Sequence, residues 1–180
     1  MNEAELIQRA RRLEGQALAS IYDTYNEAIY RYALRLLGDV TLAEDCVSET
    51  FTRFLQALSK GKGPRSHLQA YLFRIAHNWV TDYYRRSRPE TRSIEDEIGL
   101  AAKDDPAQAA LKNAQMRRTR AALLELTPDQ QAVISLKYFE GWENAEVSAM
   151  LSKPVGAVKS LQHRALAALK RMLVDEEDES

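Results

Sequence analysis

The side chains best suited to chemistry in this sequence are ones that bind nucleic acid. One strip of them lies within residues 73–86 and contains Asn78, Trp79, Tyr83, Tyr84, Arg85 and Arg86. Melting a DNA duplex needs aromatic faces that stack on unpaired bases, amides that read base edges, and cations that bind phosphates. The strip supplies all three, at a density that a core helix does not require. Trp79 is also in register with Ile75 and Tyr83, which favours a core position for its ring.

A second strip lies near the carboxyl end, in a pattern typical of a helix-turn-helix. Residues 143–151 and 155–169 have apolar positions at helical spacing, and Ser152 and Pro154 interrupt them. Since proline is tolerated in the first turn, the second helix should begin near Pro154. Opposite its apolar stripe are four side chains that can reach phosphates and base edges: Lys159, Ser160, His163 and Arg164. This arrangement predicts a major-groove reader, and a helical hairpin with a solvated basic face stays open as the alternative.

Patterns typical of enzymes are missing from the sequence. The three histidines, His67, His77 and His163, lie far apart and have no Cys/His spacing that would make a zinc site. A glycine-rich phosphate loop and a serine elbow are absent too. We therefore expect no catalytic, cofactor or metal site and no small-molecule substrate. The single cysteine, Cys46, excludes an internal disulfide and falls in an apolar stripe, so it is predicted to be a core residue.

Helical periodicity fills the first half of the chain. It predicts a short helix around residues 6–13 and longer helices over 18–37, 41–58 and 68–83. Gly38 is expected to end the first long helix. Residues 41–44 and 66–69 are expected to cap the next two.

In the second half, periodicity fades between residues 87 and 106 and resumes at 107–125. Thr127-Pro128-Asp129-Gln130 predicts a capped helix that stops at Gly141, directly before the helix-turn-helix. The expected fold is all-α, with two small helical domains joined by a flexible linker. Their predicted bounds are 1–88 and 115–174, with an acidic connector at 89–114 and an acidic tail at 175–180.

Charge is distributed unevenly along the chain. The net charge is only −1, yet residues 1–88 carry +3, 89–114 carry −3, 115–174 carry +4 and the tail carries −5. Two mildly basic bodies suit two modules on a polyanion. No run of 18 apolar residues occurs and the amino terminus lacks a signal-peptide pattern, so we expect a cytoplasmic protein without membrane insertion.

Three stretches in order resemble the bacterial RNA polymerase sigma factors of the extracytoplasmic-function group. Residues 43–51 are similar to the group's polymerase-docking motif, 71–86 to its −10 promoter-recognition helix, and 126–164 to the domain that reads the −35 element. The resemblance covers most of the chain outside the linker and tail. It implies a sigma region 2 bundle, a sigma region 4 helix-turn-helix, and promoter-specific initiation by core RNA polymerase with no catalytic centre in the factor.

The resemblance also implies site residues. Candidate −10 contacts are Asn78, Trp79, Tyr83, Arg85 and Arg86, with Lys62 and Arg65 from the loop at residues 60–66. Candidate −35 contacts are Lys159, Ser160, His163 and Arg164. Candidate polymerase contacts are Asp45, Glu49 and Phe51, although Asp45 and Glu49 fit a solvated helix face equally well. Implied partners are core RNA polymerase and promoter DNA, with an anti-sigma factor as a further candidate.

The fourth-domain stretch departs from the group's pattern at three positions. Leu161 replaces a frequent arginine, Ala157 a frequent threonine and Ser152 the usual turn glycine. These departures bear on the −35 sequence preferred. The alternative function is a stand-alone helix-turn-helix regulator whose first half senses or dimerises. A helical interaction protein without DNA contact is a third class.

Overall fold

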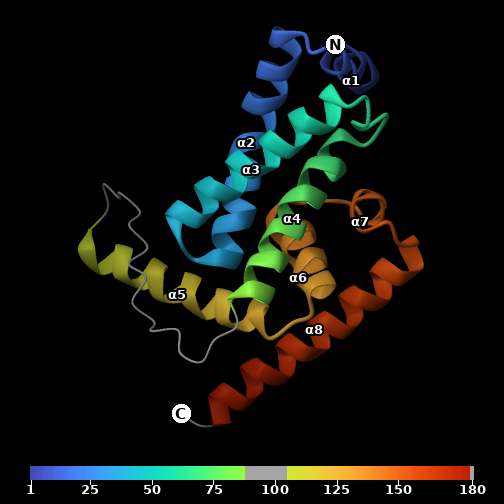
Figure 1. Ribbon diagram of the computed structural model, residues 1–180. Helices are drawn as coiled ribbons and strands as arrows, with labels where there is room; N and C mark the ends of the chain where they lie inside the picture. The colour runs from blue at the N-terminus through green and yellow to red at the C-terminus, as the bar shows by residue number, and fades with distance from the viewer. Residues whose placement is uncertain (88–104, 179–180) are drawn as a thin grey trace.

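The computed structural model describes residues 1–87 and 105–178, with side chains up to residue 174. Within these ranges every regular element is helical and no strand occurs, as the sequence predicts. The helices form two groups, one from each half of the chain (Figure 1). Residues 88–104, which include most of the predicted connector at 89–114, and residues 179–180 of the predicted acidic tail lie outside the described residues. The end of the predicted connector, residues 106–114, is part of a helix.

The first group consists of α1 (Glu3–Arg11), α2 (Gly15–Leu37), α3 (Val40–Ser59) and α4 (Leu68–Arg86). Helices α2, α3 and α4 pack on one another around a shared core. Its largest fully buried side chains are Ile21, Ile29, Tyr32, Leu36, Leu37, Phe54, Leu68, Leu72 and Phe73. Cys46 is also fully buried, which confirms its predicted core position, and burial raises the pKa of its thiol to about 12.

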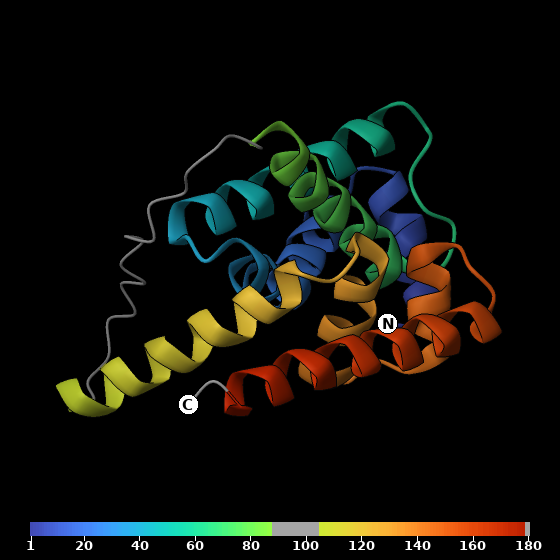
Figure 2. The same cartoon turned by 90° about the horizontal axis from the view of Figure 1, so that it is seen from below.

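The second group consists of α5 (Pro106–Leu124), α6 (Pro128–Ile134), η1 (Ser135–Phe139), α7 (Asn144–Leu151) and α8 (Val155–Asp178). The short element η1 is a single π-helical stretch that continues α6. Helix α8 is the long helix that crosses α6 and α7 (Figure 2). The core of this group is formed by Leu123, Val133, Leu136, Val147, Met150, Val158 and Ala165.

Several predicted helix ends are confirmed. Gly38 has φ of 67° and closes α2 through its N–H to the Leu34 carbonyl. Thr127 and Gln130 form the expected capping box at α6. Ser152, at the predicted turn between the two helices of the helix-turn-helix, adopts the left-handed conformation, with φ of 53°. Serine tolerates this region poorly, so the turn geometry is imposed by the helices on either side.

Other predicted ends are wrong. Helix α3 begins one residue before Thr41, because the Asp39 carboxylate accepts from the Leu42 N–H and takes over the cap. The predicted cap at residues 66–69 does not form: His67 occupies the N-cap with φ of 53° and no side-chain bond. The periodicity located both helices, but short polar segments offer several competing caps.

Three large apolar residues within the predicted helical segments are exposed. Leu13 is 49% exposed, because α1 ends at Arg11 and Leu13 turns the chain with φ of 60°. Tyr22 is 47% exposed and lies against the Phe51 ring at the edge of the core. Leu166 is 41% exposed on the outer side of α8, next to buried Ala165.

The two groups pack against each other. Helix α4 contacts α7, and α2 contacts α5 (Figures 1 and 2). Both candidate DNA-reading elements therefore belong to one compact arrangement. Among the helices described, none is long and apolar enough to cross a membrane.

Candidate nucleic-acid interface

The first predicted strip lies along α4. Asn78, Arg85 and Arg86 are exposed, while Trp79 and Tyr83 are half-buried against the core. The Trp79 and Tyr83 rings stack with centroids 6.0 Å apart and an interplanar angle of 10°. One ring therefore supports the other, and both keep part of their surface in solvent. Arg85 also pairs with Asp82 at 3.4 Å, a surface contact that costs little to break.

A buried hydrogen bond fixes the back of this helix. Tyr32 Oη lies 2.7 Å from His77 Nδ1, and both residues are almost completely buried. Burial lowers the pKa of His77 to about 4 and raises that of Tyr32, so both groups are neutral at pH 7. The bond joins α2 to α4 directly behind Asn78. Sequence reasoning considered His77 only as a metal ligand and missed this role.

The loop at residues 60–66 carries the candidate contacts Lys62 and Arg65, both exposed. Helix α1 braces it. The Arg11 guanidinium donates to the Gly63 carbonyl at 2.8 Å and to the Gly61 carbonyl at 3.2 Å. At the end of the loop, the Glu3 carboxylate accepts from the His67 N–H at 2.9 Å.

Packing explains why residue 63 is a glycine, which the sequence alone did not reveal. A Cβ at this position would lie 2.3 Å from Leu58 Cδ2. The loop therefore closes directly over the last turn of α3, where Leu58 is buried. Nothing in the sequence indicated that residues 3 and 11 would reach this loop, because the paired residues are 50 to 64 positions apart.

The second strip occupies one side of α8. Lys159, Ser160, His163 and Arg164 are all exposed and together line one shallow hollow of about 510 Å³. Val158 and Ala165, on the opposite side, are completely buried. Leu161, the departure from the family pattern, packs against the core as a half-buried residue. An apolar side chain suits that position.

A polar network supports the start of α8. Lys137 of η1 donates from Nζ to Gln162 Oε1 at 2.9 Å, and Gln162 Nε2 donates to Tyr138 Oη at 2.8 Å. Lys137 also donates to the Asn144 side chain. Lys137 of the π-helical turn thus joins Asn144, the first residue of α7, to Gln162, the eighth residue of α8. These residues look like ordinary surface polar groups in the sequence, so no pattern singled them out.

The predicted polymerase contacts lie on α3. Asp45 is exposed, whereas Glu49 pairs with Arg53 at 2.7 Å in a surface ion pair. Phe51 is 9% exposed, and its ring centroid is 4.8 Å from that of Tyr22. The exposed part of this aromatic pair is therefore Tyr22, and Phe51 lies beneath it.

Two residues of α4 contact the second group directly. Arg74 of α4 donates to the carbonyls of Ala149 and Met150 at 2.6 and 2.8 Å. Phe73 meets Trp142 edge to face with centroids 4.9 Å apart. Next to these contacts, Asn78 and Thr81 line a small pocket whose far wall includes Asp129 and Ser152.

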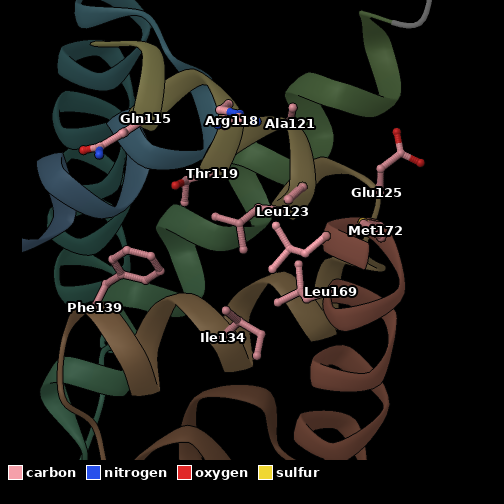
Figure 3. Close-up of a pocket in the computed structure, with 12 residues that line it drawn as sticks. Gln115, Arg118, Thr119, Ala121, Leu123, Glu125, Ile134, Phe139, Leu169 and Met172 are labelled. Carbon is pink, nitrogen blue, oxygen red and sulfur yellow. The ribbon is translucent and has the colours of Figure 1, made fainter. Parts of the chain in front are cut away.

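A larger groove runs between α5 and α8 (Figure 3). It encloses about 940 Å³, and Leu123, Ile134, Leu169 and Met172 point toward one another across it. Arg118 and Glu125 stand at its rim. The groove is mostly apolar and has no cluster of groups that could bind a metal or perform acid–base chemistry among the residues drawn.

Two exposed strips of aromatic, amide and basic side chains lie on two helical groups, one of them in a helix-turn-helix, which is the arrangement expected of a bipartite DNA-binding protein of the helix-turn-helix class. Comparison with protein families agrees: residues 21–90 match sigma-70 region 2, and residues 116–169 match sigma-70 region 4. The first match contains α4, and the second contains the helix-turn-helix.

Individual relatives identify the family more closely. The chain is 32% identical over 163 residues to the ECF RNA polymerase sigma factor SigL of Mycobacterium tuberculosis, covering 89% of this chain and 90% of SigL. It is 33% identical over 175 residues to the ECF sigma factor BldN of Streptomyces coelicolor, covering 96% of this chain and 66% of BldN. The chain belongs to the ECF RNA polymerase sigma factors.

A solved structure is similar along the whole chain. The structure of CnrH in complex with the cytosolic domain of CnrY aligns with a TM-score of 0.71 and 25% identity. The alignment covers 96% of this chain and 97% of that chain. The similarity therefore includes both helical groups.

Proposed function

We propose that this sigma factor binds core RNA polymerase in the cytoplasm, places it on promoters with −10 and −35 elements, and helps to melt the DNA around −10. The observation that carries the proposal is the presence of two different nucleic-acid strips in a chain of this family. An aromatic, amide and basic strip suits single-stranded bases, whereas a basic helix-turn-helix face suits a duplex major groove.

In this proposal the domains keep the bounds predicted above, with residues 1–88 acting at −10 and residues 115–174 acting at −35. Asn78, Trp79, Tyr83, Arg85 and Arg86 contact the −10 strand, and Lys62 and Arg65 contact it from the loop. The exposure of Asn78, Arg85 and Arg86 on α4, and of Lys62 and Arg65 on the loop, supports this assignment. Trp79 and Tyr83 are half-buried but keep part of their rings in solvent. Because the factor supplies binding energy and no chemistry, it has no catalytic centre, cofactor or metal.

On the second domain, Lys159, Ser160, His163 and Arg164 contact the −35 element. Their placement around a single hollow on α8 supports joint contact with one groove. Asp45, Glu49 and the Phe51–Tyr22 pair contact polymerase. An anti-sigma factor is a further candidate partner, since the sigma factor RpoE of Bartonella quintana, whose fold is similar, was solved with the anti-sigma factor NepR.

Binding to purified core RNA polymerase tests the proposal against a stand-alone regulator. A sigma factor should co-elute with core polymerase in gel filtration and should bind promoter DNA tightly only in that complex. Tight, specific binding to promoter DNA by the free chain, without any complex with core polymerase, would instead support the regulator. Family membership and the strip on α4 both disfavour that outcome.

A further inference from the structure

We propose that Lys137 is a positioning residue for −35 recognition: its ammonium group fixes the rotation of α8, so that the exposed strip on this helix meets the major groove in one orientation. The inference rests on the proposed function, because it concerns how the −35 contacts are held. Lys137 does not belong to that strip. It lies in η1, before the helix-turn-helix, and acts through the side chains of Asn144 and Gln162.

The buried side of α8 is held by apolar contacts. Val158 and Ala165 are completely buried, and Leu161 is half-buried against the core. Hydrophobic contacts depend on the area removed from water and have no preferred direction, whereas hydrogen bonds weaken steeply when their angle changes. The apolar contacts keep α8 on its domain, but they define its rotation less sharply than a hydrogen bond does.

Gln162 supplies the directional contact on α8. At about 100° per residue, it lies about 40° around the helix from buried Val158 and about 60° from exposed Lys159. It therefore stands at the border between the buried side and the strip. Its amide oxygen accepts from Lys137 Nζ at 2.9 Å, and its amide nitrogen donates to Tyr138 Oη at 2.8 Å. Both polar ends of the side chain are thus bound by two successive residues of η1.

Lys137 joins both helices of the helix-turn-helix at once. The residue is half-buried, and its ammonium group donates to Gln162 of α8 and to the side chain of Asn144, the first residue of α7. An ammonium group has three donors, so one lysine can hold both acceptors. Hydrogen bonds from a charged donor are about twice as strong as neutral ones. A rotation of α8 relative to α7 must lengthen or break one of them.

The backbone around Lys137 is a π-helical turn. The Glu140 N–H donates to the Ser135 carbonyl at 3.2 Å, five residues back along the chain. Leu136, directly before the lysine, is completely buried. Single π-helical turns within helices are rare and occur frequently at functional sites. This turn anchors Leu136 in the core while Lys137 reaches the two helices of the helix-turn-helix.

A small rotation of α8 is enough to disturb base reading. Side-chain atoms lie about 5–6 Å from the axis of a helix, so a rotation of about 10° moves them by roughly 1 Å. Binding groups have to be held within about 0.5 Å of their productive position. Hydrogen bonds to base edges depend on that precision, whereas contacts to phosphates carry no sequence information. Loss of the network should therefore lower sequence discrimination more than overall affinity.

Lys137→Met tests the inference, because methionine keeps an unbranched side chain and removes the ammonium group. The full-length variant in complex with core RNA polymerase would be titrated with two promoters that differ only in the −35 element, one preferred and one scrambled. The ratio of the two affinities should fall about tenfold, while the salt dependence of binding stays as in wild type. Lys170→Met, at an exposed position further along α8, is the matched control and should keep the wild-type ratio.

Gln162→Met tests the same bond from the other side. It keeps the charge of Lys137 and removes the acceptor on α8, so it should lower the ratio as well. The double variant should be no worse than Lys137→Met, since both substitutions break one bond. A loss of stability alone would lower the active fraction equally for both promoters and leave the ratio unchanged. If Lys137→Met does not fold, Gln162→Met alone decides the test.

An unchanged ratio in a folded Lys137→Met or Gln162→Met complex would overturn the inference. A weaker salt dependence of Lys137→Met would also overturn it, because that result would make the lysine a phosphate contact. So would a double variant whose loss is the product of the two single losses. If the wild-type complex does not distinguish the two −35 elements, the proposed function fails instead, so the two failures can be told apart.

Discussion

Tyr32 and His77 share a buried hydrogen bond, Oη to Nδ1 at 2.7 Å, directly behind the strip of α4 that carries Asn78. The bond crosses from α2 to α4 and fixes the rotation of α4 about its axis. The Tyr32–His77 pair therefore helps to determine which side chains of α4 face a DNA strand. Its effect should be measurable in the pH dependence of stability.

We expect stability to fall as the pH falls from about 6.5 toward 4. Burial lowers the pKa of His77 to about 4 in the folded protein, so between these values the unfolded chain binds more protons than the folded one. The loss should total roughly 3 kcal/mol, at about 1.4 kcal/mol per unit of pKa shift. Urea unfolding at several pH values would measure it.

His77→Gln is the control for this prediction, since it retains a hydrogen-bonding group and does not titrate. Carboxylates also titrate in this pH range, so the difference between wild type and variant is the quantity of interest. Equal pH slopes in the two proteins would show that His77 is not held neutral in the fold.

Glu140→Ala should destabilise the packing between the domains. The substitution leaves Arg35 buried without its carboxylate, and breaking a buried pair costs about 3–5 kcal/mol when both partners are enclosed. Arg31 is 48% exposed, so we expect about 2 kcal/mol here. Glu27→Ala removes the other, 79% exposed carboxylate of Arg31 and should change stability by less than about 0.5 kcal/mol. Equal effects of both variants in thermal unfolding would show that the ion pairs of Glu140 with Arg31 and Arg35 contribute no more than an exposed pair does.

Arg11→Ala should loosen the loop at residues 60–66. The loop loses the donor that joins the Gly61 and Gly63 carbonyls, so amide hydrogen exchange should accelerate there and much less in α4. If the loop helps to hold the −10 strand, promoter melting should slow as well. Arg12→Ala is the matched control because its side chain is 70% exposed. Unchanged exchange in the Arg11 variant would show that the bracing bonds are unimportant.

Arg164→Ala should reduce discrimination between a consensus and a mutated −35 element by about 1–3 kcal/mol if the arginine reads a base. If it contacts only phosphate, affinity should fall equally for both sequences and the salt dependence should become weaker. Lys170→Ala, exposed two turns further along α8, is the control. Competition binding of the polymerase complex to the two DNA sequences would distinguish base contact from phosphate contact. An unchanged affinity for both sequences would show that Arg164 does not contact the −35 element.

Much of the fold could be predicted because it depends on local patterns. Helical periodicity located the long helices, and Gly38 and Thr127 ended or began them as expected. The α8 strip was visible for the same reason, since residues three and four apart share one face of a helix. Caps were less predictable, because Asp39 and Thr41 compete within three residues.

Contacts between distant segments could not be predicted. Arg11, Arg74 and Glu140 read as ordinary surface charges, and no spacing within the sequence indicates their partners. Tyr32 was not among the positions that the helical periodicity singled out, and His77 became informative only when α2 and α4 were placed side by side. The two domains were predicted, but their packing depends on these long-range pairs.

Transcription from a defined promoter with core RNA polymerase and this protein alone tests the central claim most directly. We predict a run-off transcript that starts at a fixed distance from paired −35 and −10 elements, and that is lost when either element is scrambled or when Asn78 and Arg164 are both changed to alanine. A transcript that is independent of both elements, or no transcript despite stable binding to core polymerase, would contradict the account.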